Sequence, residues 1–184
     1  MIEVSLTEDI YSRATRRLDE MPIYGYSHRG AMANEVGVLG EIVACDYLTS
    51  LRVAFAEEFE TSHDLRLANG KTVDIKTKDR TVAPLPHYEC SVPLYNHSHQ
   101  NVSYYIFVSL LRDKGEPEHK ISRFTKAYIL GAANAAMMEK LGRVWHAGET
   151  DSANGTTFWT DCINIRISEL KQMGAAAASW NRTN

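Results

Sequence analysis

Two nearly continuous apolar segments constrain the fold of this chain more than any other feature. "VSYYIFVSLL" at 102–111 and "KAYILGA" at 126–132 combine β-branched, aromatic and aliphatic residues with almost no polar alternation. Such runs are typical of strands buried on both faces, which require covering layers above and below the sheet. Helical patterns at 5–21 and 31–50 precede them, and "ANAAMMEKLG" predicts a short helix ending at Gly142. We therefore predict an α/β protein.

The two N-terminal helices are predicted from caps and from apolar periodicity. Ser5 followed by Glu8 has the spacing of a capping box, so the first helix is expected to begin at Ser5. Its apolar face is formed by Ile10, Ala14 and Leu18. The helix at 31–50 has a broader apolar face. That face comprises Val38, Leu39, Ile42, Val43, Cys45 and Tyr47.

A single domain is predicted, because 184 residues fall within the usual size of one hydrophobic core. It is divided into N-terminal helices at 5–50, a core sheet at 53–132, a C-terminal helix and strands at 133–172, and a loose tail at 174–184. Within these parts we expect a loop at 22–30, a strand at 53–59, a long loop at 79–101 with a short strand at "YECSV", late strands within 142–148 and 157–167, and a closing helix at 168–173.

A hairpin is predicted at 64–78, "DLRLANGKTVDIKTK", because Asn-Gly is a strong turn signal. A two-residue loop at that turn would place Leu65 and Leu67 on the same face as Asp74 and Lys76, which mixes apolar and charged side chains. A three-residue loop or a bulge separates them, and the hydrophobic pattern favours it. In this register Leu65 pairs with Ile75, one face holds Leu65, Leu67, Val73 and Ile75, and the other holds Asp64, Arg66, Asp74 and Lys76.

Carboxylates on this hairpin and on the preceding helix point to a metal ion. Asp64 and Asp74 become near neighbours, and two carboxylates at that distance repel each other unless a cation lies between them. Glu41 lies at the edge of the apolar face of the 31–50 helix, where an unpaired charge is costly. Gly37 and Gly40 flank it, as expected if the helix approaches the sheet closely. A hard divalent ion such as Mg²⁺ would satisfy these oxygen ligands.

Four charged residues, taken in chain order, resemble the PD-(D/E)XK nuclease superfamily, the restriction-endonuclease-like fold: Glu41, Asp64, Asp74 and Lys76. In that family a helix glutamate precedes a curved hairpin, which carries an aspartate and then a (D/E)-x-K triplet. "VDIK" matches the triplet, although His63 stands where the family motif has proline. The resemblance covers 31–111. It implies a central mixed β-sheet flanked by helices, in a phage or bacterial protein.

The resemblance also implies a metal-dependent nuclease that hydrolyses phosphodiester bonds, with DNA as the expected substrate and a 5′-phosphate on the product. One or two Mg²⁺ ions, replaceable by Mn²⁺, would be held by Asp64, Asp74, the carbonyl of Ile75 and Glu41. The bound ion would lower the pKa of a water molecule, and Lys76 would orient that water. Glu35 is an alternative helix ligand. One such site cuts one strand, so double-strand cleavage would need a homodimer or a second nick.

Other residues are weaker candidates for binding. Lys78, Arg80 and the basic residues of "HKISRFTK" could contact phosphates, with solvated surface charge as the alternative. A zinc site could be formed by His87, His97 and His99 with Cys90, although the spacing matches no familiar finger. Bases could stack on Tyr88, Tyr95, Tyr104 and Tyr105, which more commonly pack in a core or interface.

Composition limits the classes of function. A net charge of -3 argues against a protein that coats nucleic acid by charge alone. Three separated cysteines argue against a disulfide framework. No signal peptide is recognisable and no apolar run approaches ~20 residues, so we expect a cytoplasmic protein, in a bacterial cell or a phage-infected host, without a membrane partner. A non-catalytic nucleic-acid-binding or assembly module on the same fold is the alternative function.

Overall fold

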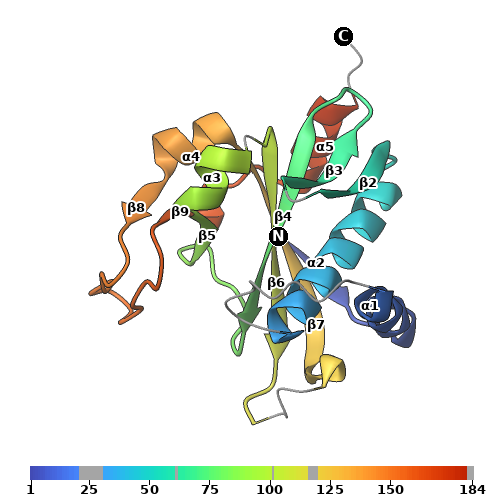
Figure 1. The fold of residues 1–184 in the computed structure, drawn as a ribbon, viewed down its shortest axis with the longest axis horizontal. Coiled ribbons are helices and arrows are strands. Elements are labelled where there is room, and N and C mark those ends of the chain that lie inside the picture. Colours follow the sequence, from blue (N-terminus) through green and yellow to red (C-terminus); the bar gives the residue numbers. More distant parts are fainter. Residues whose placement is uncertain (21–30, 61, 101, 116–119, 182–184) are drawn as a thin grey trace.

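A six-stranded mixed sheet forms the centre of the molecule (Figure 1). The computed structural model describes residues 1–20, 31–60, 62–100, 102–115 and 120–181. The strand order is β1 (Ile2–Ser5), β7 (Phe124–Asn134), β6 (Tyr104–Arg112), β4 (Thr72–Arg80), β3 (His63–Leu67) and β2 (Phe55–Glu60). Strands β4 and β6 are parallel, and all other neighbours in this sheet are antiparallel.

Both faces of this sheet are covered, as the apolar runs predicted. One face packs against α1 (Glu8–Glu20), α2 (Ala31–Ser50) and α5 (Met173–Trp180). Figure 1 shows α1 and α2 on one side of the sheet and α3, α4 and a small sheet on the other. These last elements are α3 (Leu94–Gln100), α4 (Ala135–Leu141) and the antiparallel strands β5 (Glu89–Pro93), β9 (Cys162–Arg166) and β8 (Arg143–Trp145). Two short 3₁₀ helices, η1 (Ile121–Arg123) and η2 (Ile167–Glu169), complete the fold.

Alternate residues of β6 enter two separate cores. Ile106 and Val108 belong to the core beneath α1, α2 and α5. Tyr105 and Phe107 belong to the core beneath the small sheet and α4. Because successive side chains of a strand point to opposite faces, a strand between two cores must be apolar at nearly every position. The prediction of a strand buried on both faces is confirmed.

Close approach of α2 to β4 depends on one of the two predicted glycines. A Cβ atom at Gly40 would lie 1.9 Å from Oγ1 of Thr77, so no side chain fits there. A Cβ atom at Gly37 would meet only Glu41, at an ordinary 3.8 Å. The expectation of close packing is therefore confirmed for Gly40, and the structure gives no steric reason for glycine at position 37.

The hairpin has the predicted faces but a different pairing. Leu65 pairs with Val73, not with Ile75, and the backbone amide of Leu67 donates to the carbonyl of Lys71. The turn is thus a three-residue loop. A shift of two residues preserves the alternation of side chains, so the four apolar residues still lie together in one core.

The chain ends differ from the predictions. Ser5 closes β1, a strand that the sequence pattern did not indicate, and Thr7 caps α1 instead, with Oγ1 3.4 Å from the amide of Ile10. Residues 94–100 form α3 within the segment predicted as a loop, although the short strand there is confirmed as β5. The predicted loop at 22–30 lies outside the described residues.

The C-terminal segment is the largest correction. The closing helix predicted at 168–173 is absent: η2 ends at Glu169. The tail predicted as loose from residue 174 instead contains most of α5, and its side chains enter the core beneath α2. The buried residues are Met173, Ala176, Ala177 and Trp180. Among the helices described, none is long and apolar enough to cross a membrane. The single-domain organisation stays a prediction.

Candidate functional site

Three elements contribute carboxylates to one buried region: α2 provides Glu41, β3 provides Asp64 and β4 provides Asp74. The β3–β4 pairing extends only as far as Leu65. At the next position the side chain of Asp64 takes over, and its Oδ2 accepts the backbone amide of Ile75 at 2.6 Å. The carboxylate is therefore fixed at the point where the two strands cease to pair.

Asp74 and Lys76 share one face of β4, as predicted, and that face points away from α2. They pair in parallel register with Tyr105 and Phe107, which belong to the core on that side. Asp74 is 4% exposed, and its Oδ2 lies 2.7 Å from Nζ of Lys76. This contact is an ion pair, and the same buried oxygen accepts no well-aligned hydrogen bond from any described group.

Burial makes all three carboxyl groups weaker acids, and repulsion between carboxylates adds to the effect at Glu41 and Asp64. Burial, followed by repulsion from Asp64, raises the pKa of Glu41 to about 8, against the attraction of Arg17. Burial, followed by repulsion from Asp74, raises the pKa of Asp64 to about 6, opposed by the Ile75 amide. Burial also raises the pKa of Asp74, with Lys76 opposing. Burial in this site therefore disfavours the charged form of each carboxyl group.

Arg17 of α1 is a site residue that the sequence pattern did not single out. Its guanidinium forms an ion pair with Glu41, and its Nη1 lies 3.4 Å from Glu57. A signal was present, because Arg17 follows Ile10 and Ala14 at helical spacing and so falls on the buried face of α1. A charged residue on an apolar stripe is costly to bury unless a residue of the opposite charge faces it.

Glu41 and Glu35, the two candidate ligands on α2, have different partners. Glu35 accepts from Nη1 of Arg123 at 2.6 Å, and that arginine is 3% exposed. The carboxylates that repel Glu41 are Asp64, Asp74 and Glu57. Glu41 is therefore the helix carboxylate of this cluster, and Glu35 neutralises a buried arginine.

The donor chemistry of the cluster fits a hard divalent ion, whereas its spacing does not yet form a complete site. Three carboxylates and the Ile75 carbonyl are the oxygen ligands that Mg²⁺ prefers. Oδ2 of Asp74, which now lies 2.7 Å from Nζ of Lys76, is a ligand of this kind. Across the described ranges, however, no three His, Cys, Asp or Glu side chains are placed to hold a metal ion as they stand. Instead, Lys76 forms an ion pair with Asp74, and Arg17 forms an ion pair with Glu41.

His63, which stands in the position of the family's proline, anchors the beginning of β3. Its side chain is 6% exposed, with Nε2 2.6 Å from Glu58 and Nδ1 2.8 Å from Oγ of Ser62. Arg66 donates to the same Glu58 carboxylate at 2.7 and 2.8 Å. This network holds the strand end from which Asp64 projects.

The predicted phosphate contacts differ in their surroundings. Lys78 is exposed on β4. Arg80 serves the fold instead: it donates to Oγ of Ser109 at 3.0 Å and to the carbonyl of Glu89 at 3.1 Å, and lies over the ring of Tyr88. Of the basic residues near 120–126, Arg123 forms an ion pair with Glu35, and Lys126 forms one with Glu3.

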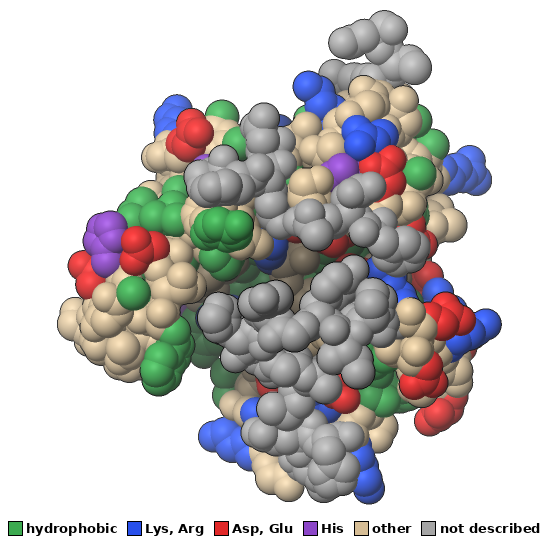
Figure 2. Space-filling view, viewed as in Figure 1, with side chains coloured by type: hydrophobic (Ala, Val, Ile, Leu, Met, Phe, Trp, Pro, Cys, Tyr) green, Lys and Arg blue, Asp and Glu red, His purple; other side chains and the backbone are tan. Residues whose placement is uncertain are grey.

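Figure 2 shows Lys and Arg side chains interspersed with Asp and Glu over α1, and hydrophobic side chains gathered over α3 and the small sheet.

Most of the described histidine and tyrosine side chains considered as ligands of zinc or bases are instead packed against other side chains. His87 packs edge-on against Tyr88. Cys90 is buried, and burial raises the pKa of its thiol to about 12, which disfavours the thiolate that zinc needs. The side chain of His99 lies outside the described residues. Tyr105 is buried and Tyr104 packs on Trp180, whereas Tyr95 is 71% exposed. His97 contacts the hydroxyl of Tyr105.

Compared with models of protein families and with curated proteins, the chain matches none. Interpretation of the site therefore depends on its residues and geometry.

Proposed function

We propose that this protein is a Mg²⁺-dependent nuclease of the PD-(D/E)XK type, built on the restriction-endonuclease-like fold, with DNA as its expected substrate. One observation carries the proposal. Three carboxylates from three elements, the half-buried Glu41 and Asp64 and the buried Asp74, lie within electrostatic reach of one another, and removal from water raises the pKa of each. A divalent cation stabilises the charged form of such groups. Their order along the chain is the order of the family motif.

Asp64 and Asp74 would be the principal ligands, with the Ile75 carbonyl and Glu41 completing the set. Asp64 is already oriented by the Ile75 amide, which leaves its second oxygen for the ion. Asp74 and Glu41 would exchange their contacts with Lys76 and Arg17 for contacts with the ion. When bound, the ion makes a water molecule acidic and neutralises charge on the scissile phosphate.

Lys76 has the position to act on the reacting groups. Its side chain is 20% exposed, so the ammonium lies at the boundary between the buried carboxylates and solvent. Released from Asp74, it would donate to the attacking water and to the phosphate oxygen on which negative charge develops. This contribution is greatest in the transition state, and so it affects rate more than binding.

A cleavage assay with one active-site variant and one surface variant tests the proposal. Labelled linear, circular, flapped and branched DNAs are incubated with protein and Mg²⁺ or Mn²⁺. Lys76→Ala should lower the rate by roughly 10²–10³-fold, the usual effect of losing one electrostatic contact to the transition state. Lys71→Ala, which removes an exposed side chain just after the hairpin loop of the same sheet, should cleave at the wild-type rate. Equal rates for wild type and Lys76→Ala would show that the site is wrongly identified.

A non-catalytic nucleic-acid-binding module is the second candidate function. It is favoured by the ion pairs that Lys76 and Arg17 already make, and by the lack of a preassembled ligand set in the described part of the chain. A module of this kind would bind the DNAs of the same panel and cut none of them with either metal. Calorimetric titration with Mg²⁺ and Mn²⁺ would separate the two functions, because only the nuclease requires a metal complex.

A further inference from the structure

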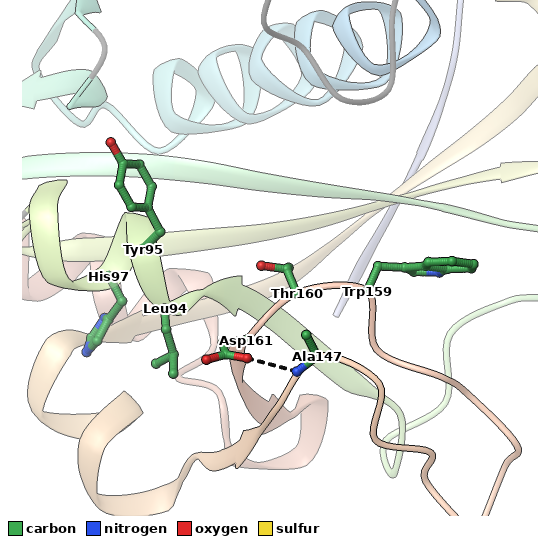
Figure 3. Close-up of a pocket in the computed structure, with 7 residues that line it drawn as sticks. All are labelled: Leu94, Tyr95, His97, Ala147, Trp159, Thr160 and Asp161. Atoms are coloured by element: carbon green, nitrogen blue, oxygen red, sulfur yellow. Dashed lines mark hydrogen bonds between the residues drawn. The ribbon is translucent and has the colours of Figure 1, made fainter.

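An aromatic pocket lies between α3 and the loop that precedes β9, on the same side of the large sheet as Asp74 and Lys76. Its volume is about 560 Å³, within the range of small-molecule sites. Figure 3 shows Tyr95 and Trp159 at opposite ends, with Thr160 and Asp161 between them. The described lining is Leu94, Tyr95, His97, Ala147, Trp159, Thr160 and Asp161.

The two aromatic side chains at this pocket are unusually exposed. Trp159 is 89% exposed and Tyr95 is 71% exposed, whereas Trp145 and Trp180 are 5% and 4% exposed. A tryptophan that lies almost wholly in water contributes nothing to the core and offers both faces of its indole to a ligand. The exposed indole of Trp159, together with the exposed part of Tyr95, indicates a ligand with a flat apolar face.

A short chain of contacts connects this pocket to the carboxylate cluster. Nδ1 of His97, in the pocket lining, lies 3.0 Å from the hydroxyl of Tyr105. Tyr105 is the direct neighbour of Asp74 in the parallel β4–β6 ladder. The charge of Asp74, after burial, contributes to raising the pKa of that phenol. The pocket is therefore separated from the candidate catalytic aspartate by two side chains.

The polar groups of the lining select against a phosphate. None of the described lining residues is Lys or Arg, and the one charged group that accepts hydrogen bonds is the carboxylate of Asp161. Its Oδ1 accepts the backbone amide of Ala147 at 2.8 Å, and its Oδ2 lies 3.5 Å from His146. A carboxylate repels phosphate oxygens and accepts hydrogen bonds from ring or exocyclic N–H groups. A nucleobase combines such groups with a flat face.

We propose that this pocket binds an unpaired nucleobase of the strand that is presented to the carboxylate site. The inference rests on the proposed function, because the strand is the nuclease's substrate. Bases within a duplex are stacked on both faces and cannot reach the two aromatic rings, whereas a single-stranded, flapped or extruded nucleotide can. The enzyme should accordingly prefer substrates with unpaired nucleotides beside the cleaved bond.

Tryptophan fluorescence measures this binding without cleavage. A short thymidine oligonucleotide and a blunt duplex of equal length are titrated into the protein in EDTA, and the emission is recorded. Because Trp159 is the exposed tryptophan of the three, stacking on it should quench the wild-type emission. Tyr95→Ala should weaken oligonucleotide binding roughly tenfold or more, the effect of losing one stacking partner. Trp159→Ala, followed by fluorescence anisotropy of a labelled oligonucleotide, should weaken it similarly.

Val144→Ala is the matched control, because Val144 is 45% exposed on β8 and lies outside the described lining. It should bind the oligonucleotide as wild type does. If both Tyr95→Ala and Trp159→Ala bind the oligonucleotide with wild-type affinity, the proposed base pocket is wrong. It is also wrong if the duplex binds as tightly as the oligonucleotide.

The two proposals fail separately. If the oligonucleotide binds and quenches as expected but no DNA is cleaved with either metal, the nuclease fails and the base pocket stands. If wild type cleaves, Lys76→Ala does not, and the pocket variants keep the wild-type ratio of flapped to duplex cleavage, the pocket fails and the nuclease stands.

Discussion

Replacing Glu41 by glutamine should stabilise the metal-free protein at alkaline pH. Burial raises the pKa of the Glu41 carboxyl from 4.5 to about 8, and repulsion from Asp64, Asp74 and Glu57 adds to the rise. A folded protein that binds this proton more tightly than the unfolded chain does loses stability as pH rises from about 4.5 through 8. Glutamine has a similar shape and no charge, so Glu41→Gln should lack this loss.

The size of the effect follows from the difference between the two pKa values. At about 1.4 kcal/mol per pKa unit, the full difference corresponds to a limit on the order of 5 kcal/mol. The side chain of Glu41 is 19% exposed, so solvent screens part of the repulsion, and the variant also loses its ion pair with Arg17. We therefore expect Glu41→Gln to gain about 2 kcal/mol over wild type at pH 9 and to match it near pH 4.5.

Urea unfolding in EDTA, followed by far-ultraviolet circular dichroism across this pH range, measures the difference. Glu139→Gln, an exposed substitution on α4, is the control and should stay within about 0.5 kcal/mol of wild type at every pH. Added Mg²⁺ should stabilise wild type at pH 8, by about 2.7 kcal/mol at a hundredfold excess over Kd, and should stabilise Glu41→Gln less.

Two results would refute the reasoning. If Glu41→Gln is less stable than wild type at pH 9 by as much as at pH 5, the ion pair with Arg17 outweighs the repulsion from the aspartates. If Mg²⁺ stabilises both proteins equally, Glu41 is not a ligand of the ion.

Three further predictions concern the site and the fold. Asp74→Asn should abolish cleavage by removing a metal ligand, and a steady-state titration should find the defect deepest at low Mg²⁺ and eased by Mn²⁺; a defect independent of metal concentration would contradict this role. Gly40→Ala should lower the free energy of unfolding in urea by about 1–3 kcal/mol, because its Cβ would meet Thr77. Adding Thr77→Ala to the same chain should restore part of this stability, and additive losses would disprove the contact. Trp180→Ala should cost about 3–5 kcal/mol, whereas a loose tail would give no change.

Local patterns were sufficient for the parts of this protein whose structure depends on near neighbours. The period-two alternation of the hairpin separated Asp74 and Lys76 from the apolar residues, and it did so although the predicted pairing was wrong by two residues, because a shift of two preserves the faces. The apolar runs of β6 and β7 likewise indicated strands covered on both sides, and the α/β class followed. A continuous run of apolar residues of this kind fits few structures other than a strand covered on both faces.

Tertiary structure decided everything that depends on a distant partner. Arg17 and Glu41 are 24 residues apart, and Glu35 and Arg123 are 88 apart, so no local pattern could assign Arg17 to the site or remove Glu35 from it. The alanine-rich end of the chain was predicted to be loose for the same reason. Small side chains give little apolar periodicity, and α5 is ordered only because the core beneath α2 accepts Ala176 and Trp180. A buried charge or a weak helix is stabilised by the surface packed against it, and that surface exists only once the chain has folded.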